Sequence, residues 1–336
     1  MVNSAILPAA ALVPLAAAAL YPGVTSDNHT CVLSAIAITD SRADGYSRVT
    51  GAVPGKVDTC CSETFGGLVL QTQFWDVYTG LESNGQILPK KSWTVHGLWP
   101  DFCNGSYTQY CDLSRQYDPK PSPNTTTGTP TGTPVPPYKG EPIDKWFASY
   151  GKSDLLAWMN KYWVSQGDPN WVFWAHEFSK HATCFSTFQT ECFGPKVNEH
   201  DDLFEFFETV ISYYKDLPTW HWLANAGIKP SNTTAYTLSH IQAALREGYG
   251  KVPYLGCGGP KYNETAAGKG SRDNGRTQLQ EVWYYNHVIG RVQNKDVVRV
   301  DADVVGGSLG NCAKAENAVW YYKRANGSET TGCQRN

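Results

Sequence analysis

The sequence predicts an α+β fold held together by disulfides. Strand-like segments occur near both ends of the chain, helical segments lie between them, and ten cysteines are spread along its length. A regular strand–helix alternation, which would indicate a doubly wound parallel sheet, is not seen in the sequence. The length of 336 residues and the hydrophobic fraction of 41% are sufficient for one large domain or two smaller ones.

Three segments rich in β-branched and aromatic residues are predicted to be strands. They cover residues 68–78, 277–290 and 296–305. A further strand-like stretch, SWTV, leads into His96, and Gly97 after it allows a close approach of the backbone. The dipeptide Trp99-Pro100 predicts a rigid turn that presents an indole.

Four segments in which apolar residues recur at helical spacing are predicted to be helices. They cover residues 144–163, 170–184, 201–217 and 237–250. The third carries its apolar face on Leu203, Phe206, Phe207, Val210 and Ile211. The fourth begins with Thr237 as a predicted N-cap and ends at Gly250.

Composition excludes several classes of protein. Aromatic residues make up 13% of the chain and charged residues only 18%, which argues against intrinsic disorder and coiled coil. With 28 Lys and Arg against 31 Asp and Glu, the formal net charge is -3, so no bulk basic field attracts nucleic acid. Protonation of all 8 histidines would raise this charge by eight to +5, so acidification reverses its sign.

The N-terminus has the features of a secretory leader. Residues 5–20 are uncharged and end in small residues, and cleavage is expected after one of Ala17 to Ala19, which makes residues 1–19 a signal peptide. The stretch is shorter than the ~18 apolar residues of a spanning helix, so no membrane attachment is expected after cleavage. A buried N-terminal helix is the alternative.

The chain also contains six N-glycosylation sequons, at Asn28, Asn104, Asn124, Asn232, Asn263 and Asn326. Together these features predict a secreted protein, either extracellular or vacuolar.

The even number of cysteines agrees with an oxidising compartment and predicts five disulfides. No CxxC pair and no zinc-finger spacing is present. About 945 pairings of ten cysteines are open on this evidence alone.

Residues 119–137 form a stretch of Pro, Thr and Gly with almost no apolar side chains. Such a composition is typical of an extended, glycosylated linker or loop. A linker would separate residues 23–118 from residues 142–336 as two domains. A surface insertion in one domain is favoured, because the chemically informative segments lie on both sides of the stretch.

The segment FWAHEFSKHATC carries a dense set of titratable side chains. In a helix, His176 and Lys180 are i,i+4 neighbours, and so are Glu177 and His181. A zinc protease needs two histidines at i,i+4, but here the second of these positions is Lys180, whose charge opposes a metal. A solvated charged helix face is the plain alternative, and the flanking aromatic residues argue instead for a cleft.

With His96 from the other segment, this set fits metal-independent cleavage of RNA. Two histidines can act as general base and general acid, while Lys180 and another His neutralise an anion such as a phosphodiester. Without a metal to generate hydroxide, the nucleophile has to come from the substrate. RNA supplies it as the 2′-OH, whose intramolecular attack gains effective molarities of roughly 10⁵–10⁸ M. His96 alone could equally be a satisfied core histidine.

These two segments resemble the motifs of the ribonuclease T2 family of secreted acid ribonucleases. HGLWP at residues 96–100 matches one family motif, and HEFSKHATC at 176–184 is similar to the other, with Ala182 where the family has Gly. The vicinal pair Cys60-Cys61 and EVWYY at 281–285 also resemble the family. The resemblance covers residues 28–315, with the 119–137 loop as an insertion and residues 316–336 as a C-terminal extension.

The resemblance implies a monomeric α+β enzyme in which several helices pack on an antiparallel sheet, without metal or cofactor. His96 and His181 would be the acid/base pair, with His181 as the first base. Glu177 and Lys180 would stabilise the pentacoordinate phosphorane, and His176 would bind phosphate. Base-binding roles would fall to Trp99, Asp101 and Tyr107, with Gln73 and Phe173 at a second base. Single-stranded RNA is the expected substrate, because unpaired bases can stack on aromatic side chains.

The resemblance also implies four disulfides, Cys31–Cys61, Cys60–Cys192, Cys111–Cys184 and Cys257–Cys312. The family partner of Cys103 would fall near Ile38, which is not a cysteine. Cys103 and Cys333 are then left over, and we expect them to pair. Ala182 would strain the backbone by about 1 kcal/mol if its position requires a positive φ, and would cost nothing in helical backbone.

Overall fold

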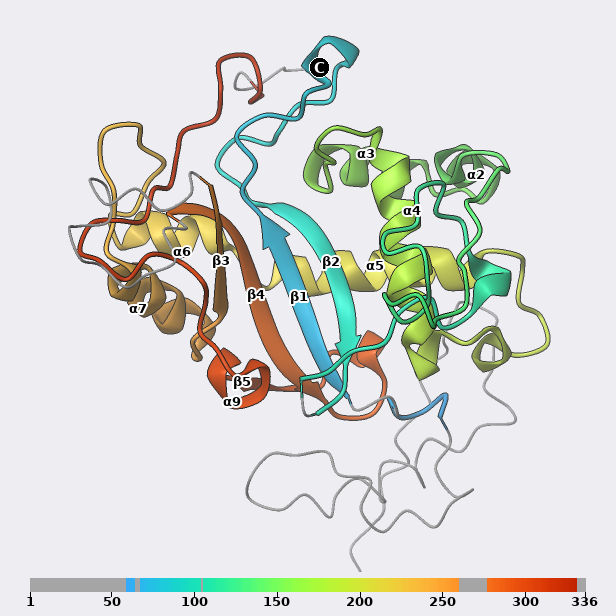
Figure 1. Ribbon diagram of the computed structural model, residues 1–336. Helices are drawn as coiled ribbons and strands as arrows, with labels where there is room; N and C mark the ends of the chain where they lie inside the picture. Colours follow the sequence, from blue (N-terminus) through green and yellow to red (C-terminus); the bar gives the residue numbers. More distant parts are fainter. Residues whose placement is uncertain (1–58, 64–66, 104, 260–276, 331–336) are drawn as a thin grey trace, which may run out of the picture.

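Five antiparallel strands form one sheet at the centre of the molecule (Figure 1). The computed structural model describes residues 59–63, 67–103, 105–259 and 277–330. The strands are β1 (Leu68–Phe74), β2 (Thr94–Asp101), β3 (Tyr254–Gly258), β4 (Gln278–Val288) and β5 (Val297–Val300). Their order is β2-β1-β4-β3, with β5 also paired to β4, so β2 is an edge strand. The predicted α+β class is confirmed.

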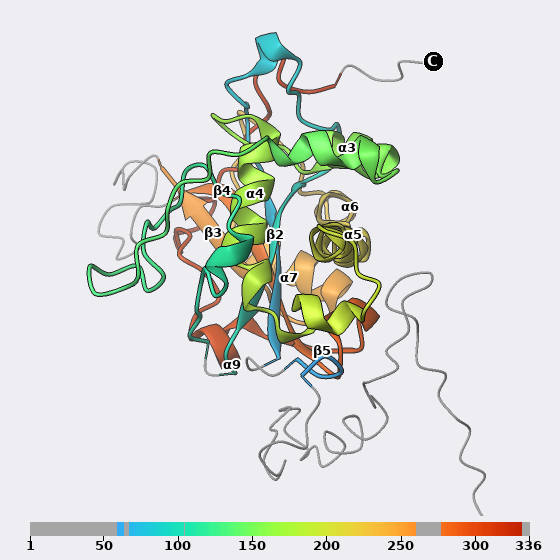
Figure 2. The same cartoon turned by 90° about the vertical axis from the view of Figure 1, so that its right-hand side faces the viewer.

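Helices cover the sheet on one side and flank its β2 edge. Besides short 3-10 turns they are α2 (Trp146–Ser149), α3 (Ser153–Tyr162), α4 (Asn170–Lys180), α5 (Asp201–Lys215), α6 (Thr219–Asn225), α7 (Leu238–Tyr249) and α9 (Ala302–Gly306). Figures 1 and 2 show α5, α6 and α7 behind the sheet and α4 beside β2. The five apolar residues predicted for one face of α5 are all buried in the core. Within the described part of the chain, no helix is both long and apolar enough to span a membrane.

Several predicted boundaries are wrong, each for a local reason. The single helix expected over 144–163 is divided into α2 and α3, because Gly151 at φ 66° reverses the chain between them. The helix expected over 170–184 ends at Lys180 and continues as a 3-10 turn. The segment 296–305 is a strand only in its first half, since α9 follows it.

The turn predicted at Trp99-Pro100 is also wrong, because both residues lie within β2. A proline cannot donate a hydrogen bond to a neighbouring strand, but an edge strand tolerates it.

The helix α7 ends at Gly250 as predicted, with φ 87°. At its start, the hydroxyl of Thr237 donates to Asn317 instead of capping the helix. Neither β3 nor α6 was predicted.

The structure contains three of the predicted disulfides, Cys60–Cys192, Cys111–Cys184 and Cys257–Cys312. Cys61 is disulfide-bonded, and its predicted partner Cys31 lies outside the described residues. Cys333 also lies outside them, so the pair Cys103–Cys333 stays a prediction.

The predicted signal peptide also lies outside the described residues, and so do three of the sequon asparagines, Asn28, Asn104 and Asn263. The other three, Asn124, Asn232 and Asn326, are exposed.

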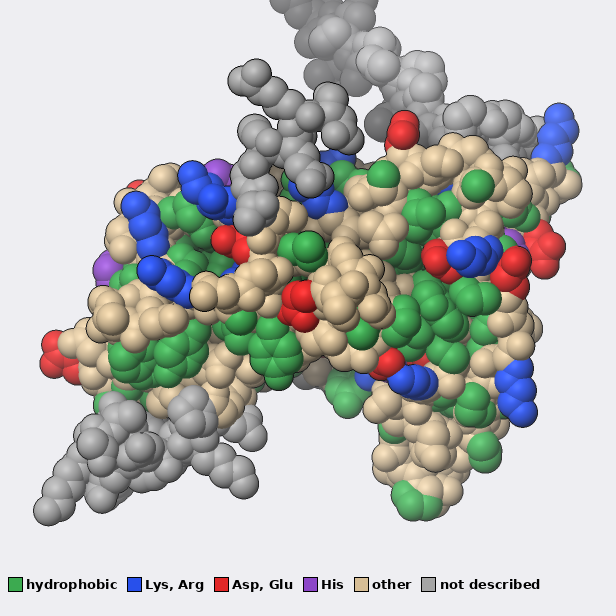
Figure 3. Space-filling model, turned by 90° about the horizontal axis from the view of Figure 1, so that it is seen from above, with side chains coloured by type: hydrophobic (Ala, Val, Ile, Leu, Met, Phe, Trp, Pro, Cys, Tyr) green, Lys and Arg blue, Asp and Glu red, His purple; other side chains and the backbone are tan. Residues whose placement is uncertain are grey.

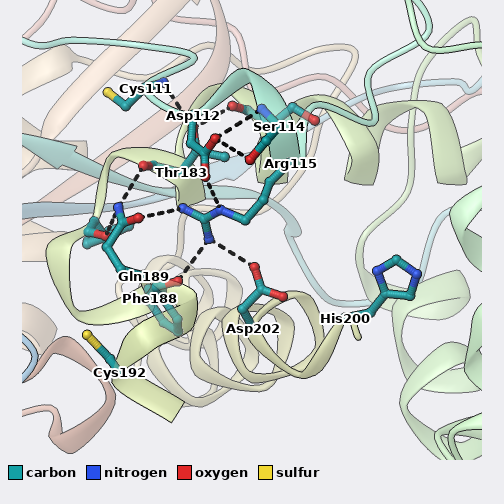
Figure 4. A network of polar contacts seen from close by, with 12 residues as sticks. Cys111, Asp112, Ser114, Arg115, Thr183, Phe188, Gln189, Cys192, His200 and Asp202 are labelled. Atoms are coloured by element: carbon teal, nitrogen blue, oxygen red, sulfur yellow. Dashed lines mark hydrogen bonds and ion pairs between the residues drawn. The ribbon is translucent and has the colours of Figure 1, made fainter. Parts of the chain in front are cut away.

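A buried arginine connects the segment before the 119–137 loop to the helical part of the core (Figure 4). The guanidinium of Arg115 donates to Asp112 at 2.7 Å, to Asp202 at the start of α5 at 2.9 Å, and to the carbonyl of Phe188 at 2.9 Å. Gln189 accepts a further bond at 3.2 Å. The ion pairs and hydrogen bonds of Arg115 offset the desolvation penalty of burying its charge.

The 119–137 loop is closed at its base and extends away from the sheet. The N–H of Tyr138 donates to the carbonyl of Asp118 at 2.9 Å, and further up Val135 donates to Asn124 at 2.9 Å and Thr126 to Thr133 at 2.9 Å. Figure 2 shows the loop, in green, projecting on the side opposite α5 and α6.

Candidate active site

The two chemically informative segments meet where α4 lies beside the edge strand β2. β2 carries His96 and Trp99, and α4 carries His176, Glu177 and Lys180. His181 is the C-cap of α4, where its backbone is still near the helical region. One segment precedes the 119–137 loop and the other follows it, so both parts of the chain contribute to the same site.

A β-bulge in β2 shapes the strand at His96. Thr72 on β1 pairs with Gly97 and Gln73 pairs with Val95, so His96 is the extra residue. Bulges redirect side chains next to functional sites. A Cβ atom at Gly97 would lie 1.8 Å from Oε2 of Glu177, which no structure tolerates. Gly97 therefore allows the Glu177 side chain to lie directly against the strand.

Glu177 is the centre of the site. Its side chain is only 1% exposed, and its Oε2 accepts a hydrogen bond of 2.8 Å from Nε1 of Trp99. Its Oε1 lies 3.7 Å from Nε2 of His96. A carboxylate oxygen of Glu177 and one ring nitrogen each of His176 and His181 lie within 4.8 Å of one another. Three imidazoles thus approach one buried carboxyl group.

His96 lies between aromatic rings and two carboxyl groups. Its ring stacks on Phe74 at 3.7 Å between centroids and meets the edge of Trp99 at 4.6 Å. Nδ1 of His96 lies 3.6 Å from Oε1 of Glu281 on β4, opposite the Glu177 side. The indole N–H of Trp283 donates to Oε2 of Glu281 at 2.9 Å and fixes that carboxyl group.

His181 stacks on the other side of the site. Its ring lies 5.0 Å from the ring of Trp99, with an interplanar angle of 20°. The indole of Trp99 therefore contacts both His96 and His181, so the two imidazoles lie close together. Ala182 lies in a 3-10 turn and is not among the residues with positive φ. Its methyl group therefore adds no backbone strain beside His181.

His176 is oriented by the base of the 119–137 loop. Its Nδ1 lies 2.7 Å from Oδ2 of Asp118, and the hydroxyl of Tyr110 donates to the same oxygen at 3.0 Å. A histidine whose Nδ1 is held by a carboxylate keeps its other ring nitrogen available for a ligand. His176 is half-buried and lies at the rim of the site.

Burial dominates the electrostatics of the site. It lowers the pKa of His96 and of His181 well below 6.5, and the charges of His176 and Lys180 lower both further. Burial also raises the pKa of Glu177 to about 8 and lowers the pKa of Lys180. The two central histidines are therefore readily neutral, while Glu177 readily keeps a proton.

The predicted residues of the first base position lie together. Trp99 and Asp101 are two residues apart on β2 and share one face, and Tyr107 forms an isolated bridge with Asp101. Tyr107 is 67% exposed, so its ring is available to a ligand. Burial raises the pKa of Asp101 to about 8.

The two residues predicted for a second base differ in outcome. Phe173 lies 5.7 Å from His96 and lines a cavity of about 280 Å³ together with Phe74, Asp76 and Glu281. Gln73 is misassigned. Its side chain is fully buried on the opposite face of the sheet, where it donates to the carbonyl of Leu217 at 3.0 Å. It follows Thr72 and precedes Phe74 on a strand, so it points away from His96.

Comparison with known proteins decides the family. Residues 66–305 match the model of the Ribonuclease T2 family. The chain belongs to the ribonuclease T2 family. Ribonuclease Le2 of Lentinula edodes is 37% identical over 250 residues, which are 74% of this chain and 85% of Le2. Ribonuclease Trv of Hypocrea rufa is 35% identical over 73% of this chain and 85% of its own length.

Other family members differ in length or have solved structures. Ribonuclease T2-like 1-A of Candida albicans is 33% identical over 73% of this chain, which spans only 51% of that protein. The crystal structure of Actibind, a T2 ribonuclease, superposes with a TM-score of 0.58 at 29% identity, covering 79% of this chain and 91% of Actibind. The antiparallel sheet with its flanking helices is therefore a T2 ribonuclease fold.

Several residues of this T2 ribonuclease site did not follow from the sequence. Phe74, Asp118, Glu281 and Trp283 contact His96 or His176 directly or through one partner. Glu281 and Trp283 lie in EVWYY, where residues two apart share a strand face, so alternation alone could have paired them. Nothing in the sequence around Asp118 indicates its contact with His176, which depends on the path of the loop.

Proposed function

We propose that the protein cleaves single-stranded RNA by metal-independent acid–base catalysis, with His96 and His181 as the acid/base pair. Endoribonuclease activity itself follows from membership of the ribonuclease T2 family. The single observation that carries the mechanism is the convergence of His96, His181 and His176 on the buried carboxyl group of Glu177.

In the first step His181 removes the proton of the 2′-OH, and the 2′-oxygen attacks phosphorus. His96 donates its proton to the departing 5′-oxygen, which leaves a 2′,3′-cyclic phosphate. The roles then reverse as water opens the ring to a 3′-phosphate. Lys180 and protonated Glu177 donate to the phosphoryl oxygens of the pentacoordinate phosphorane, and His176 binds phosphate at the rim.

The bases on either side of the scissile bond have separate places. One base stacks on Trp99 and Tyr107, and Asp101 accepts a hydrogen bond from its exocyclic amino group, which adenine, guanine and cytosine carry and uracil lacks. The other lies in the cavity beside Phe173. We further propose that the protein acts as a secreted monomer.

Product analysis on dinucleoside phosphates tests this proposal. We expect a 2′,3′-cyclic phosphate to accumulate first and to be converted to a 3′-phosphate, at the same rate with and without EDTA. Because His176, Glu177 and His181 could together hold a metal ion, the chelator is decisive. Activity lost in EDTA and restored by Zn²⁺ would assign these residues to a metallohydrolase instead.

The pH dependence of kcat/KM is expected to be bell-shaped and acidic. The base has to lose its proton and the acid has to keep one, and burial lowers the pKa of both His96 and His181. A lower pKa lets the base work at lower pH and makes the acid lose its proton earlier as pH rises. Both the rising and the falling limb of the kcat/KM profile therefore lie below pH ~6.5, the usual pKa of histidine. A kcat/KM that rises steadily from pH 5 to pH 9 would contradict the assignment.

A further inference from the structure

A second cavity, of about 270 Å³, lies on the side of the sheet away from His96. We call it the basic aromatic groove and define it by Lys91, Trp158, Tyr162, Lys215, Trp220 and His221. Its walls are the C-terminal half of α3, the end of α5, the start of α6 and the chain before β2. Figure 2 shows α3 above α5 and α6 on this side of the sheet.

The charge of the groove is one-sided. None of its 13 lining residues is acidic, whereas the chain as a whole carries a net charge of -3. Trp158 and Lys215 also line a neighbouring cavity, whose lining includes the acidic side chains Asp154, Glu208 and Asp216. Figure 3 shows Lys and Arg side chains among hydrophobic and other side chains on one face of the molecule.

Ammonium groups in and beside the groove lie over aromatic rings. Nζ of Lys91 is 5.9 Å from the ring centre of Trp220, and Nζ of Lys215 is 5.8 Å from that of Trp158. Among the described residues, neither ammonium group has a carboxylate within salt-bridge distance. Asp216, next to Lys215 in the chain, pairs with Lys295 instead, at 2.7 Å. Both lysines therefore keep their charge available for an anion.

The groove is joined to the active site by one short segment. Tyr162 lines the groove, whereas residues 164–165 line the cavity beside Phe173. Between them Trp163 donates from Nε1 to the carbonyl of His96 at 3.0 Å, which fixes the segment against β2. Tyr162 in the groove and Val164 in the cavity beside Phe173 are thus only two residues apart along this segment.

We propose that the basic aromatic groove binds a further nucleotide of the RNA substrate, outside the pair at the scissile bond. An unpaired base stacks on Trp158 or Trp220, and the phosphate lies between Lys91 and Lys215. Stacking accepts every base, and lysine contacts to phosphate carry no sequence information. The groove therefore favours long single strands over short ones. This inference rests on the proposed function, because its ligand is the RNA held in the active site.

The test compares two substrates of the Lys91→Gln/Lys215→Gln variant. For an unstructured oligonucleotide of about twelve residues we expect KM to rise about 10-fold with kcat unchanged. The slope of log KM against log salt concentration should become shallower by about 0.7, because one phosphate is no longer neutralised. A dinucleoside phosphate is too short to reach the groove, so its kcat/KM should equal that of the wild type. The matched control is Lys229→Gln/Lys314→Gln, which removes two exposed lysines that line neither cavity.

Equal effects on both substrates, or none on the oligonucleotide, would overturn the proposal. Binding of the labelled oligonucleotide to His181→Phe, with and without the two lysine changes, gives a readout that needs no turnover. A groove that binds 5′-AMP but has no influence on oligonucleotide binding would be a mononucleotide site, and the RNA assignment would be wrong.

Discussion

Replacing His181 with phenylalanine is expected to lower kcat for RNA cleavage by about 10²–10⁴-fold, and His96→Phe should do the same. Phenylalanine keeps the ring and removes both nitrogens. His181 stacks on Trp99 and His96 on Phe74, so an aromatic replacement preserves these contacts and the local packing. The loss therefore reports acid–base chemistry and not a collapsed site.

The measurement is single-turnover cleavage of a dinucleoside phosphate, with circular dichroism to confirm the fold. The control is His240→Phe, because His240 is exposed on α7, away from the site. If both substitutions left the rate within a factor of two of the control, the assignment of the acid/base pair would have no support. A variant blocked only in ring opening would accumulate the cyclic phosphate, which separates the two steps.

Gly97→Ala is expected to reduce kcat by at least ~10²-fold although it removes no chemical group. The new methyl carbon would lie 1.8 Å from Oε2 of Glu177 and 2.7 Å from Nε1 of Trp99. Glu177 then has to move. Its hydrogen bond with Trp99 is lost, and the three histidines around it lose the carboxyl group that they share. A misplacement of about 1 Å at a reacting centre can cost ~10²-fold in rate.

The double variant Gly97→Ala/Glu177→Gln isolates the cause. If the methyl group acts through Glu177, the double variant should be no slower than the slower of the two single variants, since the effects share one route. Fully multiplicative effects would show that Gly97 matters for another reason. Ala182→Gly is the matched control, because it changes one methyl group in the other segment, beside His181, where the backbone is unstrained.

The sequence was sufficient to single out His96, His176, Glu177, Lys180 and His181 as one candidate site, because they lie in two short motifs of titratable residues. The fold class and the apolar face of α5 were equally accessible, since both depend on local periodicity. Gln73 was misassigned because a single strand residue points to one face or the other, and only the pairing with β2 and β4 decides which. Glu281 and Asp118 reach the site through tertiary contacts that no local pattern records.

The loop between Asp118 and Tyr138 has a practical consequence. Its two ends are bonded to each other, and Asp118 at its root also orients His176. A change in the length of the loop at its tip should therefore not alter the position of Asp118 at its base. A peptide tag or reporter domain inserted near Gly128 should leave turnover intact. Shortening the loop until Asp118 is lost would instead leave the His176 imidazole without its orienting carboxylate. The tip of this hairpin is therefore a suitable site for engineered insertions.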